Sequence, residues 1–204
     1  MKLKMIEAKW DPLKQRLNLS DRLLYNIIHK YSEKGNAYHN IEHIMACLDE
    51  FEQIKNKAEN IDSLELAIWF HDIIYYPGAT DNESLSSMFA ELSLRDEGLS
   101  KLLINNVKRL IMSTKYNATL SDKDAYLIHD IDMSILGKDW MTFKDYDAKI
   151  AKEYSSMDKA KYVEGRKDFL KKVLSQDRLF YTPYFHDKYK NAARRNIKQY
   201  LKII

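Results

Sequence analysis

Apolar side chains recur along most of this chain at the spacing of an amphipathic helix. The pattern is clearest where they stand at positions i, i+3, i+4, i+7 and i+10, namely Ile41, Ile44, Met45, Leu48 and Phe51. Such spacing gathers the apolar groups on one face of a helix. We therefore predict a helix from about Asn40 onward. Another apolar group, at residues 23–28, follows Ser20 and Asp21, either of which can cap a helix.

A longer apolar run, LELAIWFHDIIYY, covers residues 64–76. It is apolar enough for a central, mostly buried helix. Asp62 and Glu65 lie three residues apart at its beginning and resemble a capping box. Pro77 and Gly78 would stop it.

The helical pattern continues to the end of the chain. A helix capped by Asp81 or Asn82 is predicted to reach about Arg95, and Gly98 separates it from KLLINNVKRLIM. The caps and breaks that we predict beyond it are Ser121 or Asp122, Gly137 and Pro183. Only 5 Gly and 3 Pro are present, too few for the turns of many short strands. We predict an all-α fold of about nine helices in a single domain, residues 1–204.

Composition excludes several classes of protein. Hydrophobic residues make up 45% and charged residues 31%, which is a globular balance. The single Cys47 cannot form an intramolecular disulfide and offers no Cys-based metal site, so a reducing cytoplasm is the expected setting. No apolar run approaches the ~18 residues of a membrane span, and the N-terminal segment lacks the apolar core of a secretory signal. We expect a soluble cytoplasmic protein.

The charge balance argues against a dedicated nucleic-acid binder. There are 33 basic and 30 acidic side chains, a formal net charge of +3. The local exception runs from Lys188 to Lys202 and contains six basic residues: Lys188, Lys190, Arg194, Arg195, Lys198 and Lys202. A solvated helix face explains this segment most simply, and phosphate binding is the alternative.

Two groups of polar residues interrupt the apolar pattern. His71 and Asp72 fall inside WFHDIIYY, where a carboxylate loses its hydration unless something compensates its charge. A basic side chain or a helix end could compensate it, whereas a bound cation would explain both residues together. Asp130 and Asp132 interrupt YLIHDIDMSIL in the same way. Residues two apart on a helix do not share a face, so at most one of them faces a given buried site.

These residues resemble a known pattern. His43, the pair His71–Asp72 and a later Asp resemble the H…HD…D signature of the HD superfamily of metal-dependent phosphohydrolases. YHNIEH at residues 38–43 is similar to the YHNxxH of cyclic-nucleotide phosphodiesterases, and HDIDMS resembles the region of their last metal-binding Asp. HDIIYYPGATDNESLS and YVEGRKDFL resemble an uncharacterised bacterial branch of predicted HD phosphohydrolases.

The resemblance implies a fold, a site and a chemistry. The fold would be an HD-type helical bundle, with the C-terminal helices, about 142–204, packed on the metal-binding core. The ion would be held by His43, His71, Asp72 and Asp132, and alignment of DMS selects Asp132 over Asp130. After HD the chain reads IIYYPG and lacks the further His of the phosphodiesterases. Their second metal is therefore not implied.

The expected activity is hydrolysis of a phosphoester. Two imidazoles and two carboxylates suit Mn²⁺, Fe²⁺, Ni²⁺ or Zn²⁺, and Mg²⁺ less well. Asp72 and His39 are the expected catalytic residues, with His39 giving a proton to the departing oxygen. Glu83 could act with Asp81 through water or on the nucleophile, although Asp81 can equally be a helix cap. The expected cations for an anionic substrate are Lys115, Arg166, Arg178 and Arg194.

The expected substrate is a nucleotide or a related small phosphorylated metabolite, as is common among HD proteins. A non-catalytic, regulatory module that binds a metal and a nucleotide is the alternative. A nucleic-acid adaptor that uses the basic C-terminal helix is a third hypothesis.

Overall fold

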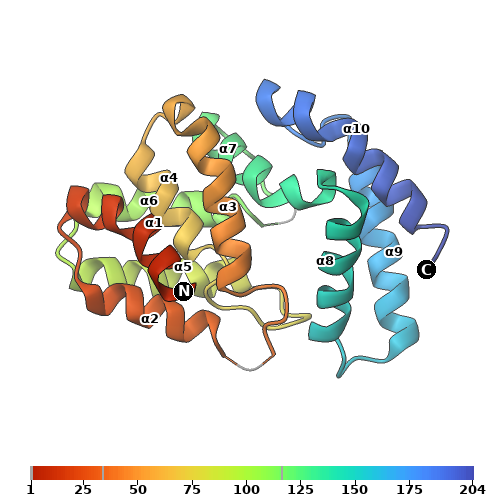
Figure 1. Cartoon of the computed structure of the whole chain (residues 1–204), viewed down its shortest axis with the longest axis horizontal. Coiled ribbons are helices and arrows are strands. Elements are labelled where there is room, and N and C mark those ends of the chain that lie inside the picture. Colours follow the sequence, from red (N-terminus) through yellow and green to blue (C-terminus); the bar gives the residue numbers. More distant parts are fainter. Residues whose placement is uncertain (1, 34, 116) are drawn as a thin grey trace. The chain divides into compact units, whose positions relative to one another are not determined.

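A computed structural model describes residues 2–33, 35–115 and 117–204, and this part of the chain contains helices joined by loops and no strand (Figure 1). The predicted all-α fold is therefore confirmed, with ten α-helices where about nine were expected. Their order is α1 (Lys2–Leu17), α2 (Asp21–Tyr31), α3 (Ile41–Ile54), η1 (Lys55–Lys57), α4 (Ile61–Phe70), α5 (Asn82–Asp96), α6 (Lys101–Met112), α7 (Lys123–Met133), η2 (Ser134–Gly137), α8 (Trp140–Glu153), α9 (Lys159–Ser175) and α10 (Pro183–Tyr200). None of the described helices is long and apolar enough to cross a membrane.

The chain divides into two compact units, residues 1–128 and 129–204, whose boundary falls within α7. The first unit holds α1 to α6, and the second holds η2 and α8 to α10. We describe each unit by itself. The expected packing of residues 142–204 on the metal-binding core stays a prediction.

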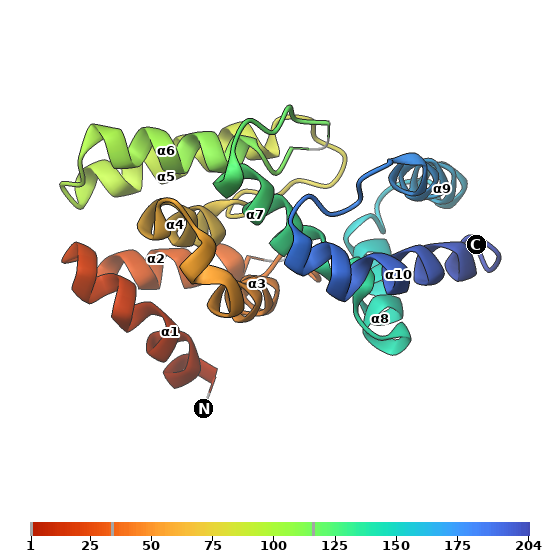
Figure 2. The ribbon, with the colours of Figure 1, turned by 90° about the horizontal axis from the view of Figure 1, so that it is seen from above.

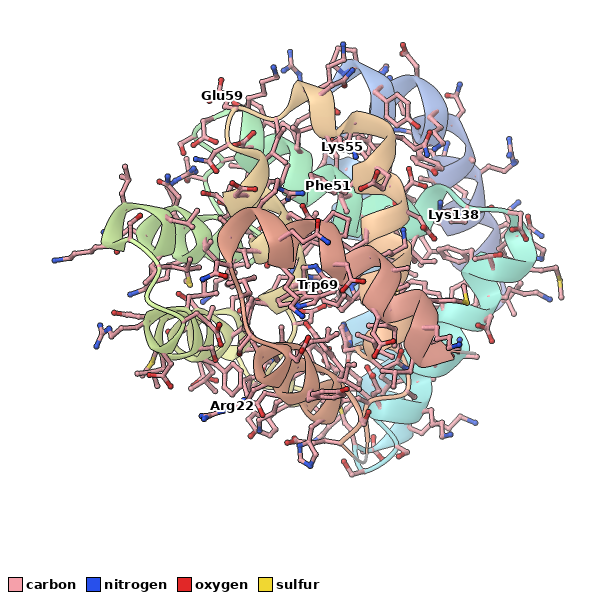
Figure 3. The ribbon with its side chains drawn as sticks, turned by 60° about the vertical axis from the view of Figure 1, so that its left-hand side comes forward. Arg22, Phe51, Lys55, Glu59, Trp69 and Lys138 are labelled. Atoms are coloured by element: carbon pink, nitrogen blue, oxygen red, sulfur yellow. The ribbon has the colours of Figure 1, made fainter. Side chains whose placement is uncertain are left out.

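Helix α4 is the centre of the first unit. Every residue from Ser63 to Phe70 is buried, and α4 packs against α3, α5 and α6. Helices α5 and α6 lie side by side (Figure 2). Phe51 of α3 and Trp69 of α4 point into the interior (Figure 3), and the Trp69 ring meets Trp10 edge-on with centroids 5.2 Å apart. Each such side chain contributes about 1.5 to 3 kcal/mol by leaving water.

Helix α1 is absent from the predicted helices, although its sequence carries the signal. Ile6, Trp10 and Leu13 are buried and stand at positions i, i+4 and i+7. Pro12 lies inside this helix. Proline usually ends a helix because it lacks an N–H and its ring crowds the preceding turn. Burial of one apolar face outweighs that cost here.

The predicted ends of the central helix are wrong at both termini. Asn60 is the N-cap and accepts a hydrogen bond from the Ser63 N–H, so α4 begins before the supposed capping box. Arg16 binds both acids of that box: its Nε donates to Asp62 Oδ1 over 2.9 Å, and its Nη2 donates to Glu65. These two acids therefore pair with Arg16, 46 residues upstream of Asp62, and do not form a capping box.

Helix α4 ends at Phe70, well before Pro77, because side chains of α5 bind the backbone that follows. Ser86 Oγ accepts from the Ile74 N–H over 3.1 Å and donates to the Ile74 carbonyl over 3.2 Å. Asn82 binds Tyr76 similarly: its Oδ1 accepts from the Tyr76 N–H over 2.9 Å, and its Nδ2 donates to the Tyr76 carbonyl over 3.0 Å. These four bonds replace helical ones, so His71 and Asp72 stand at a helix end.

Several predicted caps are confirmed. Ser20 accepts from the Leu23 N–H, and Asp122 accepts from the Ala125 N–H. The helix predicted from about Asn40 onward is capped by Asn40 itself, which accepts from the Glu42 N–H. Gly98 follows α5 with a positive φ of 74°, which suits glycine after a helix, and α10 begins at Pro183.

Candidate metal centre

His43 and His71 come from the two most buried helices of the first unit. His43 stands one turn into α3, after the Asn40 cap, and is 5% exposed. His71 is the C-cap of α4 and is 2% exposed. Their Nε2 atoms lie 3.1 Å apart. The packing of α3 against α4 thus brings together two imidazoles that are 28 residues apart in the sequence.

The backbone fixes which nitrogen of His71 faces the site. Its Nδ1 lies 3.0 Å from the carbonyl oxygen of Ile68. A carbonyl can only accept, so Nδ1 carries the proton and Nε2 of the neutral ring presents a lone pair. A backbone carbonyl that holds the second nitrogen is the usual arrangement around a metal-binding histidine.

Asp72 completes a triangle of ligand atoms with the two imidazoles. Its Oδ2 lies 3.1 Å from His71 Nε2 and 3.3 Å from His43 Nε2. An ion at ~2.1 Å from three such atoms would hold them about 3.0 Å apart in an octahedral arrangement and about 3.4 Å apart in a tetrahedral one. The triangle fits a divalent ion in either arrangement.

The charges favour a cation within the triangle. A lone pair on His71 Nε2 and a carboxylate oxygen at 3.1 Å repel each other, and either a proton on Nε2 or a bound cation between the two atoms relieves that repulsion. Burial raises the pKa of Asp72, but when His71 and His39 are protonated their charges, together with hydrogen bonds from His43 and His71, hold that pKa well below its usual range. Asp72 is therefore an anionic ligand at neutral pH.

His39 lies beside this triangle. Its Nε2 is 4.0 Å from Asp72 Oδ2, which is beyond hydrogen-bond distance. Its ring stacks on Tyr75, with centroids 3.5 Å apart and planes at 18°. The side chain keeps 13% of its surface exposed. His39 is thus oriented by an aromatic ring, close to the predicted ligands and open to solvent.

Cys47 is a candidate ligand that the sequence reasoning missed. Its Sγ lies 3.8 Å from both ring nitrogens of His43, and ligand atoms of His43, Cys47 and His71 all lie within 4.8 Å of one another. The expectation that one thiol offers no metal site considered only sites built from several thiols. The sequence did contain a signal for it, because Cys47 lies four residues after His43 and residues four apart on a helix share a face.

The two acids of α7 have different surroundings within the second unit. Asp130 is fully buried, and its oxygens accept hydrogen bonds from the Tyr181 N–H, the Thr182 N–H and the Thr182 hydroxyl. It therefore anchors the chain where α10 begins. Asp132 stands on the last turn of α7 and is half-buried. Its role as a fourth ligand stays a prediction from the sequence.

Substituting these two acids separates the two roles. Asp130→Ala should lower the free energy of unfolding by about 2 to 4 kcal/mol, because the half-buried Tyr181 and Thr182 N–H groups lose their acceptor and a fully buried side chain is removed. The metal content of this variant should equal that of the unsubstituted chain. Asp132→Ala should lose metal with a smaller loss of stability. Denaturant titration and elemental analysis of both variants measure these effects, and metal loss in Asp130→Ala alone would show that the wrong acid was chosen.

Three of the four predicted substrate-binding cations, Lys115, Arg166 and Arg194, have partners within the fold. Arg166 donates from Nε to Asp147 over 2.7 Å, and both side chains are buried. Arg194 donates to the Leu174 and Gln176 carbonyls at the end of α9. Lys115 donates to the Thr80 carbonyl over 3.0 Å, and Arg178 is exposed. Structural contacts thus account for Arg166 and Arg194, and their substrate-binding role stays a prediction.

The catalytic roles predicted for Asp81 and Glu83 at the start of α5 stay predictions. Asp81 occupies the N-cap position, but its side chain makes no capping hydrogen bond. Glu83 lies in the first turn and is half-buried.

Comparisons with protein-family models, with curated proteins and with solved structures gave no match.

Proposed function

We propose that this chain is a metal-dependent phosphohydrolase of the HD type, which hydrolyses a phosphoester of a nucleotide or of a related small phosphorylated metabolite. The observation that supports the proposal most strongly is the triangle of His43, His71 and Asp72, with its three ligand atoms 3.1 to 3.3 Å apart. The sequence resemblance supplies the reaction class, and Asp132 remains its predicted fourth ligand.

The ligand set suits a divalent transition metal. Imidazole nitrogen and carboxylate oxygen bind Mn²⁺, Fe²⁺, Ni²⁺ and Zn²⁺ well, and Mg²⁺ less well. When bound, such an ion supplies Lewis-acid chemistry, acidifying water and neutralising charge on a phosphoryl group.

The residues around the triangle have separable duties. His71 and Asp72 are held by the end of α4 and by the bonds from α5, so their positions are set before any ligand arrives. His39 would give a proton to the departing oxygen, since it stands beside the triangle outside hydrogen-bond distance of Asp72 and its ring is partly exposed. Its stacking on Tyr75 restricts the direction in which it can offer that proton.

The proposal is tested by purifying the full chain without chelator and measuring its metal content. We expect about one divalent ion per chain, given one ligand triangle. Phosphomonoesters, cyclic nucleotides and nucleoside triphosphates are then screened with Mn²⁺, Ni²⁺ and Mg²⁺ added separately. Bound metal with silence across the whole panel would favour a regulatory module that binds metal and nucleotide. Salt-sensitive binding to DNA or RNA that survives metal removal would favour the adaptor hypothesis.

A further inference from the structure

A thiol lies next to the imidazole pair of the candidate metal centre. Cys47 follows His43 by one turn of α3 and is 3% exposed. Its Sγ is equidistant, at 3.8 Å, from the two ring nitrogens of His43. Ligand atoms of Cys47, His43 and His71 also lie within 4.8 Å of one another. The site therefore offers a soft sulfur as well as a hard carboxylate.

The distances suit sulfur as a ligand. A tetrahedral ion with Zn–S of about 2.3 Å and Zn–N of about 2.1 Å would hold Sγ and a ring nitrogen about 3.6 Å apart. The observed 3.8 Å between Cys47 Sγ and His43 Nε2 is close to that value, and ligand atoms of Cys47 and His71, within 4.8 Å of each other, would move closer as the ion binds. Burial also shields the thiol from solution oxidants, which favours a ligand over a redox sensor.

We propose that Cys47 makes this centre selective between two classes of ion. Thiophilic ions such as Cd²⁺, Zn²⁺ and Co²⁺ bind through His43, His71 and Cys47, whereas Mn²⁺ and Mg²⁺ use the carboxylate and leave the thiol unligated. As the metal–sulfur bond forms, the S–H proton passes to solvent and no electron is transferred. The inference rests on the proposed metal site and deepens it.

The choice of ion has a consequence for activity. A sulfur ligand occupies a coordination position that a phosphoryl oxygen or water would otherwise use. Thiophilic ions should therefore bind tightly and support slower turnover than Mn²⁺. The chain would respond to the class of metal available to it.

The test uses the full chain with Co²⁺, Cd²⁺ and Mn²⁺ as separate probes. Co²⁺ should produce an ultraviolet thiolate-to-metal charge-transfer band, and since Cys47 is the single cysteine, the band has one possible source. Cys47→Ser should abolish the band and weaken Cd²⁺ binding by roughly 10-fold to 100-fold, while Mn²⁺ affinity stays within about 2-fold. Cys47→Ala serves as a second variant, and circular dichroism checks the fold of each.

The outcomes separate this inference from the proposed function. Binding of Co²⁺ without a charge-transfer band in the unsubstituted chain overturns the role of Cys47 and leaves the metal site standing, even if neither variant folds. Equal Cd²⁺ affinity in the unsubstituted chain and Cys47→Ser would also remove Cys47 from the ligand set. If none of the three ions binds the unsubstituted chain, the proposed metal-dependent function itself fails.

Discussion

His43→Ala is expected to lose both the bound ion and all metal-dependent turnover. The substitution removes one corner of the ligand triangle and leaves Asp72 Oδ2 beside a single imidazole. Because His71 stays 3.1 Å from this half-buried carboxylate, the loss of folding stability should be smaller than the about 3 to 5 kcal/mol of a fully buried charge left without a partner. Metal affinity should fall at least ~100-fold, since ligand loss exceeds the effect of losing a ligand's hydrogen-bond partner.

Elemental analysis and thermal denaturation with and without a chelator measure these losses. An ion at 100 times its dissociation constant stabilises the folded state by about 2.7 kcal/mol, so a chelator should lower the melting temperature of the unsubstituted chain. It should leave that of His43→Ala unchanged. His29→Ala is the matched control, because His29 is an exposed histidine on α2 of the same unit. A chelator-sensitive His43→Ala variant would show that His43 is not a ligand.

The fold was predictable wherever the determining residues are close in sequence. Ser20 and Asp122 cap helices through bonds to residues three positions away, and both were among the predicted caps. The end of α4 was not predictable in this way, because Asn82 and Ser86 bind residues 74–76 from another helix. The apolar run itself contains no sign of that interruption.

Part of the candidate site was predictable because a charged side chain in an apolar segment needs a partner. A carboxylate in an apolar run requires a partner, and that argument singled out Asp72, whose Oδ2 lies 3.1 and 3.3 Å from two buried imidazoles. Its role as a metal ligand stays a prediction. The same reasoning could not tell whether a buried acid binds a metal ion or forms an ion pair with a basic side chain of the fold. Arg166 illustrates the difficulty, since its counter-ion Asp147 is 19 residues away on another helix.

His39→Ala is expected to keep the metal and lose turnover. Its imidazole stands outside the ligand triangle, with Nε2 4.0 Å from Asp72 Oδ2, so its removal opens no coordination position. A lost general acid lowers the catalytic rate by about 10² to 10⁴-fold, with substrate binding changed much less. Metal content and the chelator-dependent shift in melting temperature should match those of the unsubstituted chain.

The leaving group gives this prediction a sharper form. A nitrophenolate hardly needs a proton as it departs, whereas a natural alkoxide does, so the defect of His39→Ala should shrink markedly with nitrophenyl esters. Comparison of kcat for the two substrate types in both proteins measures the difference. A structural role for His39, such as support of Tyr75 through the stacked rings, would lower both rates alike. An equal defect with both leaving groups, or a site emptied of metal, would therefore show that His39 is a structural residue or a ligand and that the proton comes from another group.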